Sequence, residues 1–113
     1  MWQDNTDVIN LKLNRLEFKF YCKDLNLANR EDWRVPTYKE MISLIDYTQS
    51  DPASIDRIEK IVASQYWTST KSVLKKNQNW FVDFKYGTTD IDSDLQRHHI
   101  RCVRKISTKE GDY

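Results

Sequence analysis

One run of acidic residues has the spacing of metal ligands. Asp90, Asp92 and Asp94 alternate like the first ligands of an EF-hand calcium loop. Such a loop also needs glycine at its sixth position, for a sharp turn, and a bidentate glutamate at its twelfth. This chain has Leu95 and Arg101 there. We therefore interpret the segment as an acidic hairpin tip.

Two adjacent histidines, His98 and His99, are further possible metal ligands. Neighbouring residues of a strand point to opposite faces of a sheet, so the pair cannot share one ion. Neither histidine has a second ligand at the spacing of a zinc site. We expect no metal, and no other cofactor.

Nucleophilic catalysis has few candidates. The chain lacks a G-x-S-x-G elbow, and with two glycines it has no glycine-rich phosphate loop. Cys22 and Cys102 could join a histidine in a catalytic group, because such groups assemble in space. However, both cysteines fall on apolar faces, where thiols pack or pair instead of reacting. We expect no catalytic residue.

Positive charge gathers late in the chain. Three lysines lie in an expected loop over residues 71–79, and five cations load the last strand and tail, among them Arg101, Arg104, Lys105 and Lys109. Such charges are usually solvated or paired with nearby acids, but they could also hold a sulfated or phosphorylated polymer. The candidate ligand-binding residues are Lys71, Lys75, Lys76, Arg97, His98 and His99.

Two capping boxes predict helices in the first half. Asn14 with Glu17 starts the first helix, which should end within residues 26–29. Its apolar face has residues three or four apart: Phe18, Tyr21, Cys22 and Leu25. Thr37 with Glu40 starts the second helix, which should run to about Tyr47. Apolar spacing over residues 55–62 also permits a short third helix.

The second half has the alternation of strands. It is clearest over residues 79–87, and we expect further strands over 66–70 and 99–106, with a loop over 88–99. Helices first and strands afterwards, without βα alternation, predict an α+β domain with an antiparallel sheet.

Composition restricts the class of protein. With 113 residues, the chain should form one domain over residues 1–113. Its net charge of +1 gives no overall field toward nucleic acid, and no window has the roughly 18 to 20 apolar residues of a membrane span. We therefore expect no nucleic acid partner and no membrane insertion.

One segment is more specific than these patterns. Residues 32–40 read D-W-R-V-P-T-Y-K-E, which resembles the D-W-R-L-P-T-x-x-E signature of the Lcl C-terminal domain family, a bacterial domain of unknown function found in surface and secreted proteins. Other motifs resemble that family in the same order: M-W-Q-D-N at 1–5, Y-C at 21–22, Y-W-T-S-T at 66–70, the tryptophan-to-glycine run at 80–87 and R-C-V-R at 101–104.

The resemblance implies a C-type-lectin-like fold, with two main helices flanking a small twisted antiparallel sheet. In that fold a cysteine of the first helix commonly bonds one on the last strand, which implies a Cys22–Cys102 disulfide. We interpret the signature residues as structural, with Trp33 in the core and Arg34 bonded to sheet or loop carbonyls. The structural set is Trp33, Arg34, Pro36, Thr37, Glu40, Trp67 and Trp80.

Three functions stay open. The first is a non-enzymatic binding or adhesion domain, periplasmic or on the cell surface by resemblance, although the first residues lack a signal-peptide pattern. It would present the loops over 71–79 and 88–99 to a macromolecular ligand, a sulfated glycan or a protein. The second is a structural or assembly module, which includes a homo-oligomer. The third is an enzyme similar to the formylglycine-generating sulfatase-modifying enzymes, which need a reactive cysteine pair near a cleft.

Overall fold

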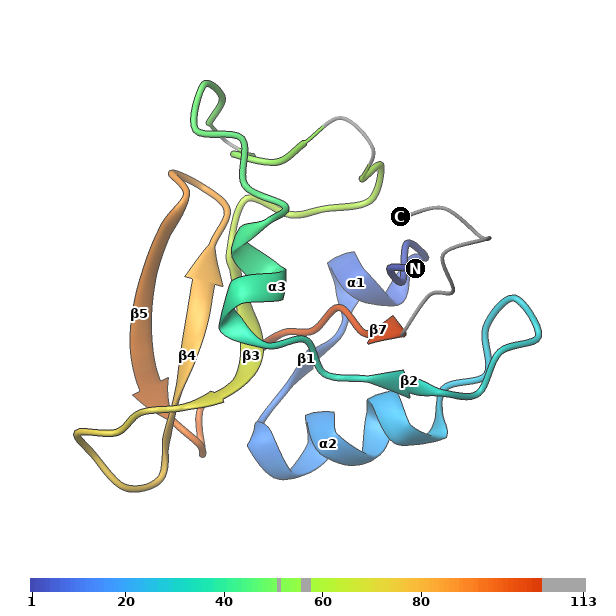
Figure 1. Cartoon of the computed structure of the whole chain (residues 1–113), viewed down its shortest axis with the longest axis horizontal. Helices are drawn as coiled ribbons and strands as arrows, with labels where there is room; N and C mark the ends of the chain where they lie inside the picture. The colour runs from blue at the N-terminus through green and yellow to red at the C-terminus, as the bar shows by residue number, and fades with distance from the viewer. Residues whose placement is uncertain (51, 56–57, 105–113) are drawn as a thin grey trace.

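The fold is organised around a mixed β-sheet (Figure 1). The computed structural model describes residues 1–50, 52–55 and 58–104. A five-stranded sheet has the order β1-β6-β3-β4-β5, and β2 pairs with β7 in a second, two-stranded sheet. The strands are β1 (Lys12–Leu13), β2 (Trp33–Arg34), β3 (Gln65–Lys71), β4 (Gln78–Asp83), β5 (Thr88–Ser93), β6 (His98–His99) and β7 (Val103–Arg104). The helices are α1 (Asp7–Asn10), α2 (Arg15–Asp24) and α3 (Tyr38–Ile42).

Both predicted capping boxes are present. The Asn14 side chain accepts a hydrogen bond from the backbone N–H of Glu17, and the Glu17 carboxylate accepts one from Asn14 in return. Thr37 and Glu40 repeat this arrangement at the start of α3. Since each box satisfies backbone donors that a helix leaves unpaired at its start, the two helices begin where the sequence predicts.

The expected C-type-lectin-like arrangement, an α+β fold with two main helices flanking a small antiparallel sheet, is wrong. The sheets dominate, and the three helices among the described residues have 4, 10 and 5 residues. The larger sheet is mixed, because β6 pairs with β3 in parallel through Tyr66 and His99. The structure therefore has short helices placed around a mostly β core.

The second predicted helix, α3, ends earlier than expected for a local reason. Beyond Ile42 the backbone bonds three residues back, from Leu44 to Met41 and from Ile45 to Ile42, which tightens the chain into a turn. Ile45 then forms a bridge with Ser54. A continued helix would remove that bridge, so α3 ends five residues before the predicted Tyr47.

Three other expectations are also wrong. No helix forms in the described part of the segment 55–62. The expected loop over 88–99 contains β5 and β6, because β5 pairs with β4 along its whole length. The expected strand over 99–106 is interrupted at residues 100–102, and its last two positions lie outside the described residues.

The N-terminal residues, the segment around β7 and the two cysteines close the fold. A disulfide joins Cys22 on α2 to Cys102, with 5.6 Å between the Cα atoms, as the resemblance implied. Beside it, the Gln3 N–H donates to the Cys102 carbonyl at 2.9 Å, and Trp2 forms a bridge with Val103. The N-terminal segment is thus fastened to the segment around β7 by backbone pairing as well as by the nearby covalent bond.

Two buried clusters fill the interior. One lies around the disulfide and includes Phe18, Trp33 and Trp67. The other packs the end of α3 against β3 and β4, with Met41, Leu44, Tyr66, Val82 and Phe84 among its members. No helix within the described ranges is long and apolar enough to cross a membrane.

Candidate functional site

Several side chains of the signature segment, residues 32–40, form hydrogen bonds within the segment or with its neighbours in sequence. Trp33 is buried, and its indole N–H donates to the Arg30 carbonyl at 3.0 Å. Arg34 does not bond carbonyls as expected. Its two terminal nitrogens each lie 2.7 Å from a carboxylate oxygen of Glu40, in a bidentate pair that spans the helix start.

That ion pair has an electrostatic consequence. The hydrogen bonds from Arg34 lower the pKa of Glu40 to about 2, and the backbone N–H of Thr37, which also donates to this carboxylate, contributes to the same shift. Glu40 is therefore charged at neutral pH and serves both the capping box and the ion pair. Pro36, also buried, accepts a hydrogen bond at its carbonyl from the Ser69 N–H at 2.8 Å.

The two other tryptophans of the structural set differ in burial. Trp67 is fully buried, and its indole N–H donates to the Leu13 carbonyl at 2.8 Å. Trp80 is half-buried and meets the Tyr38 ring edge-on, with 5.5 Å between the ring centroids. Trp67 therefore offers no ring surface to a ligand, and part of the Trp80 ring is covered by Tyr38.

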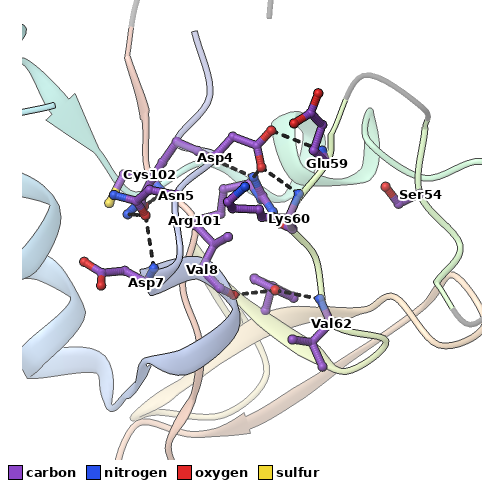
Figure 2. Close-up of polar contacts among 12 residues, drawn as sticks. Asp4, Asn5, Asp7, Val8, Ser54, Glu59, Lys60, Val62, Arg101 and Cys102 are labelled. Atoms are coloured by element: carbon purple, nitrogen blue, oxygen red, sulfur yellow. Dashed lines mark hydrogen bonds and ion pairs between the residues drawn. The ribbon is translucent and has the colours of Figure 1, made fainter. Parts of the chain in front are cut away.

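Arg101 belongs to a buried polar network and not to a basic surface patch (Figure 2). Its guanidinium donates to the carbonyls of Gln3 and Lys60 and lies 3.5 Å from the Asp4 carboxylate. Asp4 also accepts hydrogen bonds from the backbone N–H groups of Glu59 and Lys60. Burial lowers the pKa of Arg101, and the network fastens the segment before β3 to the N-terminal segment.

The histidines are poorly placed for a ligand. His98 lies against the rings of Trp67 and Phe81 and has its Nε2 atom 2.7 Å from the Asp92 carboxylate. His99 is buried and stacked on Tyr66, where desolvation lowers its pKa. Of the six candidate ligand-binding residues, these two pack against aromatic rings of the sheet.

The predicted cations are more accessible. Lys71, Lys75 and Lys76 are exposed and line one hollow of about 310 Å³ at the end of the sheet. Arg97 is exposed too, but its guanidinium lies 3.3 Å from the carboxylate of Glu17. Of the other cations in the expected patch, Arg104 is buried and bonded to Asp32, and Lys105 and Lys109 lie outside the described residues.

A second hollow of about 400 Å³ adjoins the first, because Arg15 and Asn79 line both. Its lining has an apolar part, formed by Phe18, Trp33 and Val35. Its cations are Arg15, Lys19, Lys23 and Arg34.

The cations of the two hollows form one surface, which we name the basic track. It consists of Arg15, Lys19, Lys23, Lys71, Lys75 and Lys76. The three residues on α2 are four positions apart, so they share one helix face at intervals of roughly 6 Å. Arg34 faces the track from β2, but its charge is offset by Glu40.

The lysines of the track are electrostatically unsatisfied. Within the described part of the chain, none of its five lysines has a carboxylate within ion-pair distance. One acid lines the track, Asp94, whose carboxylate lies 3.7 Å from the Arg15 guanidinium. The surface therefore carries a local excess of positive charge although the whole chain is nearly neutral.

Sequence reasoning missed half of this surface. The candidate residues of the sequence analysis do not include Arg15, Lys19 or Lys23. The signal was available in part, because a basic residue at every fourth position predicts a charged helix face. That the face adjoins the loop carrying Lys75 and Lys76 depends on tertiary packing.

Metal ligands do not gather in the described part of the chain, where no three His, Cys, Asp or Glu side chains are placed to hold an ion. The alternating aspartates instead lie on β5, where Asp90 and Asp92 form hydrogen bonds to the following backbone N–H groups. The expected acidic hairpin tip is therefore wrong: Asp90 and Asp92 belong to a strand, and Asp94 begins a turn that leads to β6, which pairs with β1 and β3.

No curated protein and no solved structure matches this chain. One family model does match, and it covers residues 1–104 of the 113, from the N-terminal pairing through the signature segment to β7. By that match, the chain belongs to the Lcl C-terminal domain family.

Proposed function

We propose that this chain is a non-enzymatic binding or adhesion domain that holds an anionic macromolecule along the basic track, and that a sulfated glycan is the ligand. The observation that carries the proposal is that two adjoining hollows are together lined by seven cations, six of them in the basic track, and by a single acid among the described residues. The same proposal locates the domain in the periplasm or on the cell surface of a bacterium, since a disulfide persists in oxidising compartments.

The geometry favours a polymer over a small anion. Each exposed ion pair contributes only about 0.2 to 1 kcal/mol in water, so one sulfate on one lysine would bind weakly. A chain with many anionic groups can contact Lys19, Lys23 and the lysines of the other hollow together, and the contributions then combine. The length of the track is thus matched by an extended ligand.

The aromatic residues favour a glycan over a single-stranded nucleic acid. Proteins that bind single strands stack bases on exposed aromatic rings. The two rings beside the track, Phe18 and Trp33, are each 4% exposed. They give the hollow an apolar base but leave little ring surface on which a base could stack.

Heparin is the probe for the proposal, measured by titration calorimetry at low and at physiological salt. Reversing the charge of Lys19 and Lys23 together should weaken binding by about tenfold, because two weak ion pairs become repulsions. The matched control reverses Lys39 and Lys85, which are exposed and line neither hollow of the track. It alters the net charge equally and should keep nearly the original affinity.

Salt gives the same experiment a second criterion. Heparin affinity should fall as salt rises, because exposed charges are screened beyond about 10 Å at 0.1 M. A flat titration of the unaltered protein at low salt would contradict the proposal. Equal losses in the track and control variants would show that binding follows net charge alone, and would contradict the assigned surface.

An assembly module is the second candidate, and a different surface favours it. Leu16 and Phe20 lie four residues apart on α2 and are 67% and 52% exposed. A shallow hollow beside Phe20 is lined by Leu11, Leu13 and Leu25. If copies associate through this face, Phe20→Ser should convert a larger species to a monomer in sedimentation velocity. A protein that is already monomeric would exclude this candidate.

The absence of enzymatic activity stays part of the proposal. The formylglycine type of enzyme needs a reactive cysteine pair near a cleft. Both cysteines of this chain are joined in the disulfide and have no exposed surface. Copper-dependent oxidation of a cysteine-containing peptide by the purified protein would contradict this part.

A further inference from the structure

Three aliphatic side chains project from the end of the sheet that carries the lysines. Val73 and Leu74, in the loop between β3 and β4, are 96% and 86% exposed, and Leu95, in the turn after β5, is 83% exposed. Figure 1 shows the β3–β4 loop extending beyond the strands that it joins. We name these three residues the aliphatic tip.

The two segments of the tip lie side by side and are held by local hydrogen bonds. The Asp94 N–H donates to the Asn77 carbonyl at 2.9 Å, which joins the turn to the loop. The Ser72 hydroxyl accepts from the backbone N–H groups of Leu74 and Lys75. Hydrogen bonds within the loop therefore hold its backbone, while the side chains of Val73 and Leu74 are exposed to solvent.

Lysines flank the loop residues of the aliphatic tip. Lys71, Lys75 and Lys76 flank Val73 and Leu74 in sequence, and all three are exposed. No acid occurs in residues 71–79, and the nearest acid in the turn, Asp94, lies by Arg15. The protein thus has a small apolar projection with three exposed lysines beside it in the same loop.

We propose that the aliphatic tip docks on the surface of a lipid bilayer with anionic headgroups. Val73, Leu74 and Leu95 enter the boundary between headgroups and acyl chains, and the lysines contact the lipid phosphates. Only side chains enter the lipid, and no segment crosses it. The lysines of this contact also belong to the basic track, but its apolar residues line neither hollow of the track, so the apolar part of the contact can be tested apart from the glycan proposal.

Shape and chemistry favour lipid over the other partners. A sulfated polymer offers nothing apolar to the tip, which would stay in water beside it. A stable protein interface needs about 800 Å² from each partner, far more than three projecting side chains supply. A bilayer needs no matching shape, and anionic headgroups complement the three lysines of the loop.

The test is cosedimentation with vesicles of phosphatidylglycerol mixed with phosphatidylcholine, compared with phosphatidylcholine alone. The unaltered protein should bind the mixed vesicles and bind neutral vesicles far less. Val73→Ser with Leu74→Ser should lower the partition coefficient by about tenfold, because two apolar side chains are lost from the interface. The matched control, Tyr47→Ser with Tyr86→Ser, removes two exposed large side chains that belong to no proposed surface and should bind as before.

A second variant separates insertion from a general effect of substitution. Leu74→Trp should keep or strengthen vesicle binding, since tryptophan favours the membrane interface. The serine variant keeps every lysine, so its heparin affinity should not change, and the glycan and lipid proposals can fail separately.

Three outcomes would overturn the lipid proposal. These are no binding of the unaltered protein to anionic vesicles, equal binding by the serine variant of the tip, and loss of binding in Leu74→Trp. If the serine variant instead alters the sedimentation coefficient of the free protein, the tip contacts a second copy and the proposal is wrong.

Discussion

The signature segment and the basic track lie next to each other, yet their charges are used in opposite ways. Arg34 in the segment has both terminal nitrogens on Glu40, whereas Lys19 and Lys23 across the same hollow have no carboxylate partner within the described residues. Arg34 and Glu40 of the segment pair with each other and stabilise the start of α3. The lysines of the track remain in contact with water, where they can bind a ligand.

This contrast teaches where function can be sought in such a chain. The most recognisable motif identified the family, but its side chains mainly build and wall the hollow. The ligand-facing charges lie on a helix face and a loop whose residues form no motif. A substitution in the segment should therefore affect folding first, and one in the track should affect binding alone.

The largest expected effect comes from the segment's buried ring. Trp33→Ala should lower the free energy of unfolding by about 3 to 5 kcal/mol, because it removes a large side chain from the cluster around the disulfide. Denaturant unfolding followed by circular dichroism measures the loss. Trp80→Ala, at a half-buried ring, is the control and should cost less. Equal costs would contradict the assigned difference in burial.

The disulfide should rank second. Replacing Cys22 and Cys102 with alanine should lower stability by about 2 to 4 kcal/mol, since the unfolded chain regains the entropy of a loop with a sequence separation of 80. The heparin affinity of the folded fraction should stay the same, because neither cysteine lines the track. Two alkylatable thiols in the folded, unreduced protein would show that the bond is absent.

Sequence-based prediction succeeded where the physics is local. A capping box needs residues only three positions apart, so Asn14 with Glu17 and Thr37 with Glu40 could be identified directly. The sequence patterns did not predict β5, because its polar residues are typical of a loop. The strand forms because its backbone pairs with that of β4.

The candidate site was only partly predictable for the same reason. Lys71, Lys75 and Lys76 were identified from their density in one loop. Their meeting with Arg15 on α2 joins residues 56 to 61 positions apart, which local patterns do not show. Arg101 was misassigned to the surface because the carbonyls that receive its guanidinium come from remote segments.

Acid should weaken the segment and spare the track. The folded pKa of Glu40, about 2, lies below the ordinary value of 4.5, so its ion pair stabilises the protein above pH 4.5 and the contribution is lost as pH falls toward 2. Because the pair is partly exposed, we expect a loss of about 1 kcal/mol. Glu40→Gln should remove this part of the pH dependence in denaturant unfolding. An unchanged pH profile in that variant would contradict the assignment.

The smallest expected effect is a change in heparin affinity when the acid of the track is removed. Asp94→Asn should tighten heparin binding by about threefold, because it frees Arg15 from its carboxylate partner and removes the acid from the track. Calorimetry measures the change, with Asp83→Asn, an acid that lines neither hollow, as the control. Weaker binding in the Asp94 variant would mean that this carboxylate contacts the ligand or orients the track.

The central claim is that the ligand contacts the basic track, and mapping of backbone amide resonances during a heparin titration tests it most directly. We predict that the largest shifts occur at Lys19, Lys23, Lys75 and Lys76, with small shifts at Lys39 and Lys85 on other surfaces. Shifts centred on those two control lysines, with the track unmoved, would contradict the account.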